Sequence, residues 1–503
     1  MLTDLQQARK NNLAKRKPYL AKKLSGIQER EERGEISPQI RLEKSYLCNF
    51  QCSHCSAEYY MDRHLEKVIK ITDTREKMNL DDIRSISRQA DELGINRFVI
   101  TGGEPLVMRD FDQVVEAIDP ERHYIFTDTN GWFMDEKRAR HIASLGVEKV
   151  QMSLDSMIEA EHDKFRNKPG SYKRVLRAVD ACIDAGLNLI LSTVLVRGRA
   201  STDEFRSMCE FVQRKGIGLY VSYAKPTGSC SDHPEWVITK EDADKVREME
   251  RQYNVFTHMT PSYGSYKGCI TVKGTLTVSS TMEVMPCPYI DMSLGNLRTT
   301  PLKEVINRGM SNPWLGPHRP DCLIGENPKF IKLHQDKTKG AKLLPLPYGE
   351  GFTDHDEATT PDYYKVEEAG VEFEIHAGET LVSLLEKCGA RLDTAVPGSI
   401  PAEHSFRGRY FPTIKGASIQ EAQRKDHSPY RLASAMETAA ALAANPKLLL
   451  NTESYAPLLW LAKEATETDG YYFEQYGDTL TFNRRAHLGK KSDYWRAGVV
   501  LDL

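Results

Sequence analysis

Short apolar runs alternate with longer amphipathic segments from residue 40 to about residue 225. The apolar runs lie at 40–47, 97–101, 123–127, 149–154, 187–195 and 218–224. The segments between them, at 80–93, 112–118, 135–145, 171–185 and 202–215, have helical spacing, and several are followed by glycine. This alternation predicts parallel strands joined by right-handed helical crossovers. We therefore expect an α/β fold whose main part is a partial (β/α)6 barrel, similar to an incomplete TIM barrel.

The pattern changes after a predicted helix at 241–253. Short β-rich runs at 269–274, 276–279 and 283–287, followed by a short helix, predict a small β-hairpin-plus-helix module. Beyond the Pro- and Gly-rich stretch at 343–351 we expect an α+β domain, with a strand and helix at 371–387 and helices at 428–444 and 455–467. Ser428 is the expected N-cap of the first of these two helices and Pro429 its first residue.

Four domains follow from this pattern: a basic helical N-terminal extension at 1–38, the barrel at 39–235, the small module at 236–334 and the C-terminal α+β domain at 335–503. The extension is expected to be a solvated arm packed loosely on the barrel, in preference to a docking segment for a charged partner.

Composition excludes several classes of function. The net charge of −3 over 503 residues argues against nucleic-acid binding, which relies on a strongly basic surface. No apolar run is long enough to span a membrane, and the first residues lack the apolar core of a signal peptide. We expect a cytoplasmic protein, in which clustered cysteines are metal ligands rather than disulfides.

Three cysteines lie in one short loop directly after the first predicted strand. Cys48, Cys52 and Cys55 have CxxxCxxC spacing, which suits three corners of a 4Fe-4S cluster and leaves one iron without a protein ligand. The alternative is a structural zinc site, which needs four ligands, and no fourth cysteine lies nearby. His54 could serve as the fourth ligand only by straining the loop that it shares with Cys55. The spacing therefore favours a cluster with an open iron.

Polar groups follow the next three strands. Gly102, Gly103 and Glu104 come after the second strand, where two glycines permit close backbone approach to a ligand and a carboxylate suits an ammonium. Asn130 and Ser153 follow the third and fourth strands. Functional groups of parallel barrels collect at this end of the strands, so we expect one site there. An ordinary turn is the alternative for the glycines.

At this point the chain resembles the radical S-adenosylmethionine (SAM) superfamily over roughly residues 40–225. The three-cysteine motif and the Gly-Gly-Glu-Pro sequence at 102–105 carry the resemblance. It implies a 4Fe-4S cluster whose unique iron binds the amino and carboxylate groups of SAM. It also implies reductive cleavage of SAM to a 5′-deoxyadenosyl radical, which abstracts a hydrogen atom from the substrate.

The resemblance further implies roles for single residues. Glu104 and the adjoining glycines would bind the amino group of the methionine moiety, while Ser153 and Arg166 would hold its carboxylate. Arg166 suits a carboxylate because guanidinium binds it in a bidentate manner, although a surface charge at a helix end is the alternative. His54 departs from the family, in which many members have an aromatic residue before the third cysteine.

A second set of cysteines, Cys269, Cys287 and Cys322, lies in the small module. A hairpin can bring the first two together and a helix can return the third, which predicts an auxiliary 4Fe-4S cluster rather than three buried thiols. The region resembles the twitch form of the SPASM domain, except that Met282 replaces the usual glycine. The fourth ligand is Cys230, a group other than cysteine, or a bound substrate.

The expected function is hydrogen abstraction from a small polar metabolite, with net oxidation or rearrangement. The 38-residue extension is too short for the peptide-recognition domain that many peptide-modifying maturases carry, but a peptide substrate remains the alternative. Flavodoxin or ferredoxin is the expected electron donor. A non-catalytic iron-sulfur protein for electron transfer or scaffolding is the competing class. No catalytic acid or base is assigned; Lys225, Tyr223 and Glu326 are candidates by position only.

Overall fold

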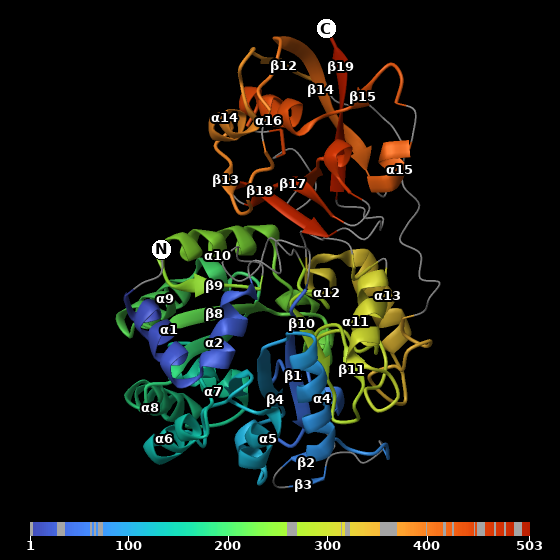
Figure 1. Cartoon of the computed structure of the whole chain (residues 1–503). Coiled ribbons are helices and arrows are strands. Elements are labelled where there is room, and N and C mark those ends of the chain that lie inside the picture. Colours follow the sequence, from blue (N-terminus) through green and yellow to red (C-terminus); the bar gives the residue numbers. More distant parts are fainter. Residues whose placement is uncertain are drawn as a thin grey trace.

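The structure is a computed structural model of the chain, shown in Figure 1. It describes residues 4–27, 36–60, 63–64, 67–68, 74–258, 269–312, 314–316, 322–352, 370–398, 400–415, 419–424, 427–446, 448–449, 458–466, 469–476, 479–486 and 495–503. Within these ranges no helix combines the length and the apolar character that a membrane span requires.

The six predicted barrel strands are present and parallel, which confirms the predicted fold class. They are β1 (Gln39–Ser45), β4 (Arg97–Gly102), β5 (Tyr124–Thr129), β6 (Lys149–Ser153), β7 (Asn188–Leu195) and β8 (Gly218–Tyr223). Their order in the sheet follows their order in the chain. Each βα unit therefore adds one strand to the same edge, as repeated right-handed crossovers do.

The predicted barrel helices are also present. They are α4 (Leu80–Glu92), α5 (Phe111–Ile118), α6 (Glu136–Ser144), α8 (Ser171–Asp184) and α9 (Asp203–Arg214), followed by α10 (Lys240–Gln252). Local chemistry fixes several of their first turns; Asn79, for example, forms a capping box with Asp82 before α4. Helix α7 (Glu159–Arg166) was not predicted, because its single buried side chain, His162, leaves no apolar period to detect.

The small module is not separate from the barrel. Strand β10 (Thr275–Val278) pairs in parallel with β1, β11 (Val284–Met285) pairs with β10, and β9 (Val255–Phe256) extends the opposite edge, giving nine strands. One hydrophobic core runs from Ile40 to Phe352 and includes side chains of α11 (Leu302–Ser311), α12 (Leu323–Glu326) and α13 (Pro328–Thr338). The predicted division at 235/236 therefore falls inside one core.

The strand predicted at 269–274 is wrong. These residues form a tight turn, in which Gly274 N donates to Ile270 O at 2.8 Å and Val272 has a left-handed φ of 59°. The cause is the position of β10, which begins at Thr275 and must align with Gln39 of β1.

The N-terminal arm consists of α1 (Asp4–Arg16) and α2 (Pro18–Ser25) and packs firmly on the barrel, contrary to the expected loose contact (Figure 1). Lys17 is 3 % exposed and lies 2.9 Å from Glu148, which also pairs with Arg16 at 2.7 Å. Lys23 pairs with Asp91 at 2.6 Å. The basic residues of the arm thus meet carboxylates of the barrel. The rest of the predicted extension, residues 28–35, lies outside the described residues.

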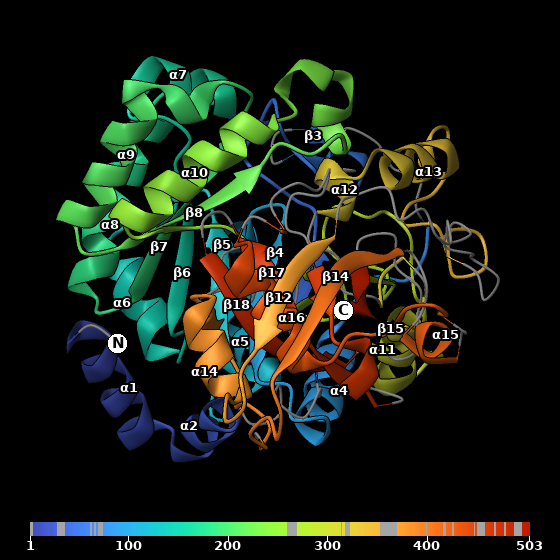
Figure 2. The ribbon, with the colours of Figure 1, turned by 90° about the horizontal axis from the view of Figure 1, so that it is seen from above.

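The C-terminal domain is built on a mixed sheet of its own, in the order β12-β14-β19-β16-β17-β18-β13, with β15 beside β19. The strands are β12 (Val371–Ile375), β13 (Arg391–Leu392), β14 (Phe406–Lys415), β15 (Arg431–Leu432), β16 (Leu458–Trp460), β17 (Asp469–Tyr476), β18 (Thr479–Ala486) and β19 (Trp495–Asp502). Helices α14 (Leu381–Lys387), α15 (Ile419–Arg424) and α16 (Ala435–Ala444) pack with it (Figure 2). Its two cores share no residue with the barrel core.

Two helix predictions in this domain need correction. Helix α16 begins at Ala435 rather than near Ser428, because Ser434 forms a capping box with Glu437 and the preceding residues pair with β19. The helix predicted at 455–467 is wrong: β16 occupies part of it, and residues 455–457 and 467 lie outside the described residues. Pairing of β16 with both β17 and β19 buries Trp460, which outweighs local helix propensity.

Candidate functional site

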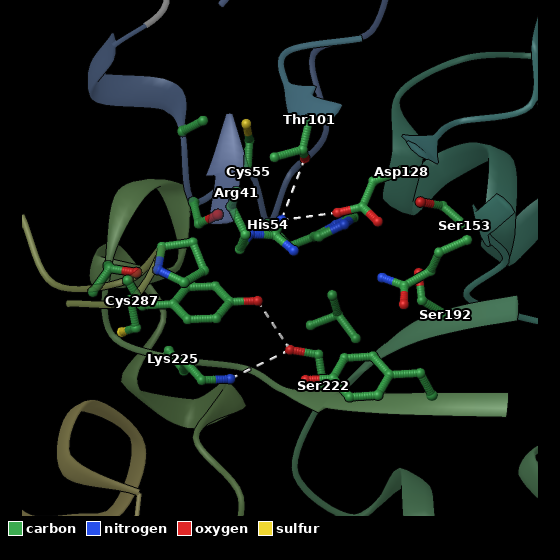
Figure 3. Close-up of a pocket in the computed structure, with 18 of the residues that line it drawn as sticks. Arg41, His54, Cys55, Thr101, Asp128, Ser153, Ser192, Ser222, Lys225 and Cys287 are labelled. Atoms are coloured by element: carbon green, nitrogen blue, oxygen red, sulfur yellow. Dashed lines mark hydrogen bonds and ion pairs between the residues drawn. The ribbon is translucent and has the colours of Figure 1, made fainter. Parts of the chain in front are cut away.

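A cavity of about 280 Å³ lies at the carboxyl ends of the barrel strands (Figure 3). All the predicted site residues line it: Cys48, Cys52, Cys55, Gly102, Gly103, Glu104, Asn130, Ser153, Arg166, Cys269, Cys287 and Cys322. Residues up to 274 positions apart in the chain (322 minus 48) therefore meet in one cavity. The structure brings the two cysteine sets to a common space, which sequence spacing alone does not require.

The first cysteine loop is fixed by backbone hydrogen bonds at its edges. Ser53 N donates to Phe165 O at 3.1 Å, and Cys55 N donates to Cys52 O at 3.2 Å. Burial raises the pKa of the Cys48 and Cys52 thiols, and it raises the pKa of Cys55 to about 12. The thiols are therefore protonated on their own. A bound metal centre would have to displace these protons, as thiolate ligation requires.

Gly102 and Gly103 lie against the backbone that leads into the cysteine loop. Gly103 N donates to Ser45 O at 3.0 Å, and a Cβ at Gly103 would lie 2.3 Å from Leu47 O. The space left by the missing side chain is thus filled by the neighbouring chain segment. We predicted that these glycines allow a ligand to approach the backbone. The structure shows that they also allow the end of β4 to pack against the segment that follows β1.

Glu104 is buried and connects the ends of β4 and β5. Its carboxylate accepts hydrogen bonds from Thr129 Oγ1 at 2.7 Å, Asn130 N at 2.7 Å and Leu106 N at 3.1 Å. Burial nevertheless raises its pKa to about 7. A carboxylate has roughly four acceptor positions, so one position is left for a donor in the cavity. Asn130 also donates to Asn49 Oδ1 at 2.8 Å and so ties this rim to the cysteine loop.

Arg166 is not a surface charge. Although it is the last residue of α7, its side chain is 11 % exposed, its Nε donates to Asp155 Oδ2 at 2.5 Å, and its Nη1 lies 3.8 Å from Cys52 Sγ. Burial acts to raise the pKa of Asp155, but the Arg166 guanidinium overcomes this effect and the pKa lies well below its usual range. Ser153 lines the cavity at the end of β6. A permanent positive charge thus lies beside the cysteine loop.

His54 stacks on Phe165, with ring centroids 4.1 Å apart and planes at 12°. Burial lowers its pKa to about 3, and the nearby Arg166 acts in the same direction. The imidazole is therefore neutral, and one of its faces is already covered by an aromatic ring.

The second cysteine set is assembled by three different elements. Cys269 precedes β10, Cys287 follows β11 and Cys322 is the N-cap of α12; all three are buried. A hydrogen bond between the Cys269 and Cys322 thiols lowers the pKa of Cys269 and raises that of Cys322. Met282 has a left-handed φ of 69°, so this position adopts the conformation that a glycine would favour.

Neither cysteine set closes around a single ion. Among the described residues, no group of three or more His, Cys, Asp or Glu side chains is arranged to hold one metal ion. The first loop offers three thiols to the cavity, which is the number that leaves one iron of a 4Fe-4S cluster without a protein ligand. The candidate fourth ligand Cys230 lies 3.7 Å from His54 O and is therefore packed against the first loop.

Several cavity residues were not singled out from the sequence. Arg41 of β1 donates from Nη2 to Asp128 Oδ2 at 2.8 Å and to Thr101 Oγ1 at 3.3 Å (Figure 3). Tyr289 and His258 also line the cavity. The sequence feature that could have indicated Arg41 is the alternation of polar and buried apolar residues in β1. A polar face toward the interior is unusual for a barrel strand.

The three residues nominated by position have different surroundings. Lys225 and Tyr223 line the cavity, and Lys225 Nζ lies 4.2 Å from the centroid of the Tyr289 ring. Glu326 accepts a hydrogen bond from Cys322 N at 2.7 Å. Glu326 therefore supports the position of Cys322, while Lys225 contributes a charge to the cavity itself.

A parallel partial barrel with three cysteines after its first strand, and a second cysteine set in the same cavity, defines a class of iron-sulfur protein. Residues 42–212 match the model of the radical SAM superfamily, which confirms the resemblance expected from the sequence motifs. Its members are enzymes that use a 4Fe-4S cluster and SAM. The cofactors inferred from the first loop are thus those of the family.

Curated relatives are similar over about half of the chain. The AdoMet-dependent heme synthase of Nitratidesulfovibrio vulgaris is 22 % identical over 302 residues, covering 54 % of this chain and 79 % of the relative. The GTP 3′,8-cyclase of Marinobacter nauticus is 27 % identical over 234 residues, covering 46 % and 67 %. The relatives therefore include enzymes with different reactions.

Two solved structures overlap partly with this chain. Streptococcus suis SuiB bound to precursor peptide SuiA has a TM-score of 0.43 and 14 % identity, covering 64 % of this chain and 72 % of SuiB. Native anSMEcpe with bound AdoMet has a TM-score of 0.40 and 17 % identity, covering 59 % and 84 %. Overlaps at these scores carry no conclusion about ligand or substrate.

Proposed function

We propose that this chain is a radical SAM oxidoreductase that carries a second, auxiliary 4Fe-4S cluster and acts on a small polar metabolite. Cys48, Cys52 and Cys55 would hold the cluster that binds SAM. Cys269, Cys287 and Cys322 would hold the auxiliary cluster. The proposal includes a cytoplasmic location and a flavodoxin or ferredoxin as electron donor, because reductive SAM cleavage needs a reductant of low potential.

One observation carries the proposal: both cysteine sets line the same cavity of about 280 Å³. A substrate in that cavity would lie between the two clusters. When bound, SAM and its cluster supply a 5′-deoxyadenosyl radical for hydrogen abstraction. An auxiliary cluster in the same space suits an electron acceptor, which would make the overall reaction an oxidation.

The chain's own residues account for SAM binding in this proposal. The free acceptor position of Glu104 and the end of β4 suit the N–H donors of the amino group of the methionine moiety. Arg166 has donors beyond the Nε that binds Asp155, and together with Ser153 it suits the carboxylate. The buried, polar walls would orient both groups and keep bulk water from the reacting atoms.

Two observations support a small molecule over a peptide. The cavity walls come from the interior faces of the barrel strands, so the substrate would have to enter the barrel. The sequence relatives named above include a GTP 3′,8-cyclase and a heme synthase, neither of which is named for a peptide substrate. Peptide modification is the second candidate function, in which a side chain would enter the cavity.

The test is anaerobic reconstitution with iron and sulfide, followed by SAM and dithionite. We expect 5′-deoxyadenosine and methionine in equal amounts. A protein that contains both clusters and forms no 5′-deoxyadenosine would contradict the proposal and favour a non-catalytic iron-sulfur protein. Deuterium transfer from labelled candidate substrates into 5′-deoxyadenosine would then distinguish a metabolite from a peptide.

A further inference from the structure

Polar and charged side chains line part of the barrel interior beneath the cysteine loop. Branched apolar side chains commonly fill the interior of a parallel barrel. Here the cavity is lined from successive strands by Arg41, Asp128, Ser153, Ser192 and Ser222 (Figure 3). The neighbouring residues of β1, Ile40 and Leu42, are fully buried on the opposite face. The polar side chains thus face the cavity while the apolar side chains of the same strand face the core, and this arrangement predicts a polar ligand.

Arg41 has hydrogen-bonding capacity that the protein does not use. A guanidinium has five N–H donors. In Arg41, Nη2 donates hydrogen bonds to Asp128 and Thr101. Its Nε and Asp128 Oδ1 are buried and have no hydrogen-bond partner among the described residues, so neither atom is open to a ligand. The nitrogen left to face a ligand is Nη1, which takes part in neither of the hydrogen bonds to Asp128 and Thr101. The side chain of Arg41 is 16 % exposed, and Arg41 lines the cavity. The Arg41–Asp128 ion pair therefore does not satisfy all the polar atoms of its two side chains, as a purely structural ion pair would be expected to do.

The two other cations that line the cavity, Arg166 and Lys225, have different assignments, and Arg166 is assigned to SAM. Lys225 donates to Tyr223 O at 2.9 Å and to Ser222 Oγ at 3.3 Å, and it covers the ring of Tyr289. It lies beside the auxiliary cysteines, since Gly325 is close to both Lys225 and Cys322. Lys225 therefore has thiolates to balance its charge when a cluster is bound. Of the three cations, Arg41 is the one that has no assignment to SAM or to the auxiliary site, and not all of its donors are used within the protein.

We propose that Arg41 anchors a carboxylate or phosphate group of the substrate, and that Ser192 and Ser222 bind hydroxyl groups on its carbon skeleton. Asp128 is the positioning residue that orients the guanidinium. This inference rests on the proposed function and names its substrate class: a small hydroxylated oxyanion. A guanidinium binds either kind of oxyanion through paired hydrogen bonds, and probes that carry one or the other distinguish phosphate from carboxylate.

The test measures ligand binding to the full-length, reconstituted and unreduced protein, without SAM. Three probes are titrated: ribose 5-phosphate, gluconate and uncharged ribose. We expect one of the charged probes to bind at least about tenfold more tightly than ribose, because charge-assisted hydrogen bonds are the stronger ones. The better of the two charged probes identifies phosphate or carboxylate as the preferred group.

Two variants make the result specific to the ion pair. Arg41→Gln combined with Asp128→Asn leaves a neutral pair of similar shape without an unpaired buried charge, and should remove the preference for the charged probe. Asp128→Asn alone keeps an acceptor that can orient the guanidinium but removes the competing negative charge, and it should tighten binding of the charged probe several-fold. Arg84→Gln combined with Asp81→Asn alters an exposed Arg–Asp pair of α4, at 2.7 Å, and is the matched control.

Equal affinity for ribose and both charged probes would overturn the inference, as would a double variant that keeps the preference. A weaker charged probe in Asp128→Asn would also contradict it. Because these measurements use neither SAM nor reductant, they are independent of 5′-deoxyadenosine formation. Failure of the proposed function and failure of the anion site would therefore be distinguished.

Discussion

The two cysteine sets line one cavity but arise in different ways. The first set occupies eight consecutive residues, and its geometry depends on one loop held by its neighbours. The second set combines a turn before β10, the end of β11 and the first turn of α12. The first set can be recognised in the sequence because its cysteines are close together in the chain. The second set forms only when the chain folds and β10 pairs with β1. We therefore expect SAM cleavage to require the first set, and iron binding by the second set to require the folded barrel.

The largest effect is expected from removing the first set. The triple variant Cys48→Ala, Cys52→Ala, Cys55→Ala should lower 5′-deoxyadenosine formation on the order of 1,000-fold or more, because no centre remains to reduce SAM. Iron should fall from roughly eight to roughly four atoms per chain. Iron close to zero in this variant would mean that the second set holds no cluster.

Removing the second set should separate the two roles. In Cys269→Ser, Cys287→Ser, Cys322→Ser, iron should again fall by about half, but SAM cleavage with dithionite should remain within about tenfold of the wild-type rate, since the first cluster is intact. Thermal unfolding checks the fold, because all three thiols belong to the barrel core. Complete loss of SAM cleavage in a folded variant would break the proposed division between the two sets.

Gly103→Ala tests how the first loop is positioned. A Cβ there would lie 2.3 Å from Leu47 O, so the backbone must shift, and we expect a destabilisation of about 2 kcal/mol or more together with weaker SAM binding. Gly26→Ala is the matched control: its φ of −82° suits alanine and its nearest atom is 3.8 Å away. Its free energy of unfolding should change by less than about 1 kcal/mol. Similar behaviour of both variants would argue against the close packing described for Gly103.

A smaller effect is expected from pH. Burial raises the pKa of Glu104 to about 7, and the ionised carboxylate is the form that accepts a hydrogen bond from the amino group of SAM. SAM affinity should therefore rise as pH increases through 7 and then level off, by up to about tenfold between about pH 6 and pH 8. Glu104→Gln should bind SAM more weakly and without this slope. An unchanged slope in Glu104→Gln would assign the titration to another group.

The barrel and the first loop could be predicted because their signals are local. Each βα unit has its own periodicity, and three cysteines in eight residues need no long-range contact. Arg41 and Asp128 were missed because they are 87 positions apart and meet only through strand register (128 minus 41). The place of β10 beside β1 was missed for the same reason. The error at Ser428 has a local cause, since a second serine, Ser434, provides the better cap.

The most direct test of the two-cluster account is the electron paramagnetic resonance spectrum of the dithionite-reduced protein, recorded with and without SAM. We predict two 4Fe-4S signals in the wild type, only one of which changes when SAM is added. The Cys48→Ala, Cys52→Ala, Cys55→Ala variant should lose the SAM-sensitive signal and keep the other. A single signal in the fully reconstituted wild type, or a SAM-sensitive signal that persists in the variant, would contradict the account.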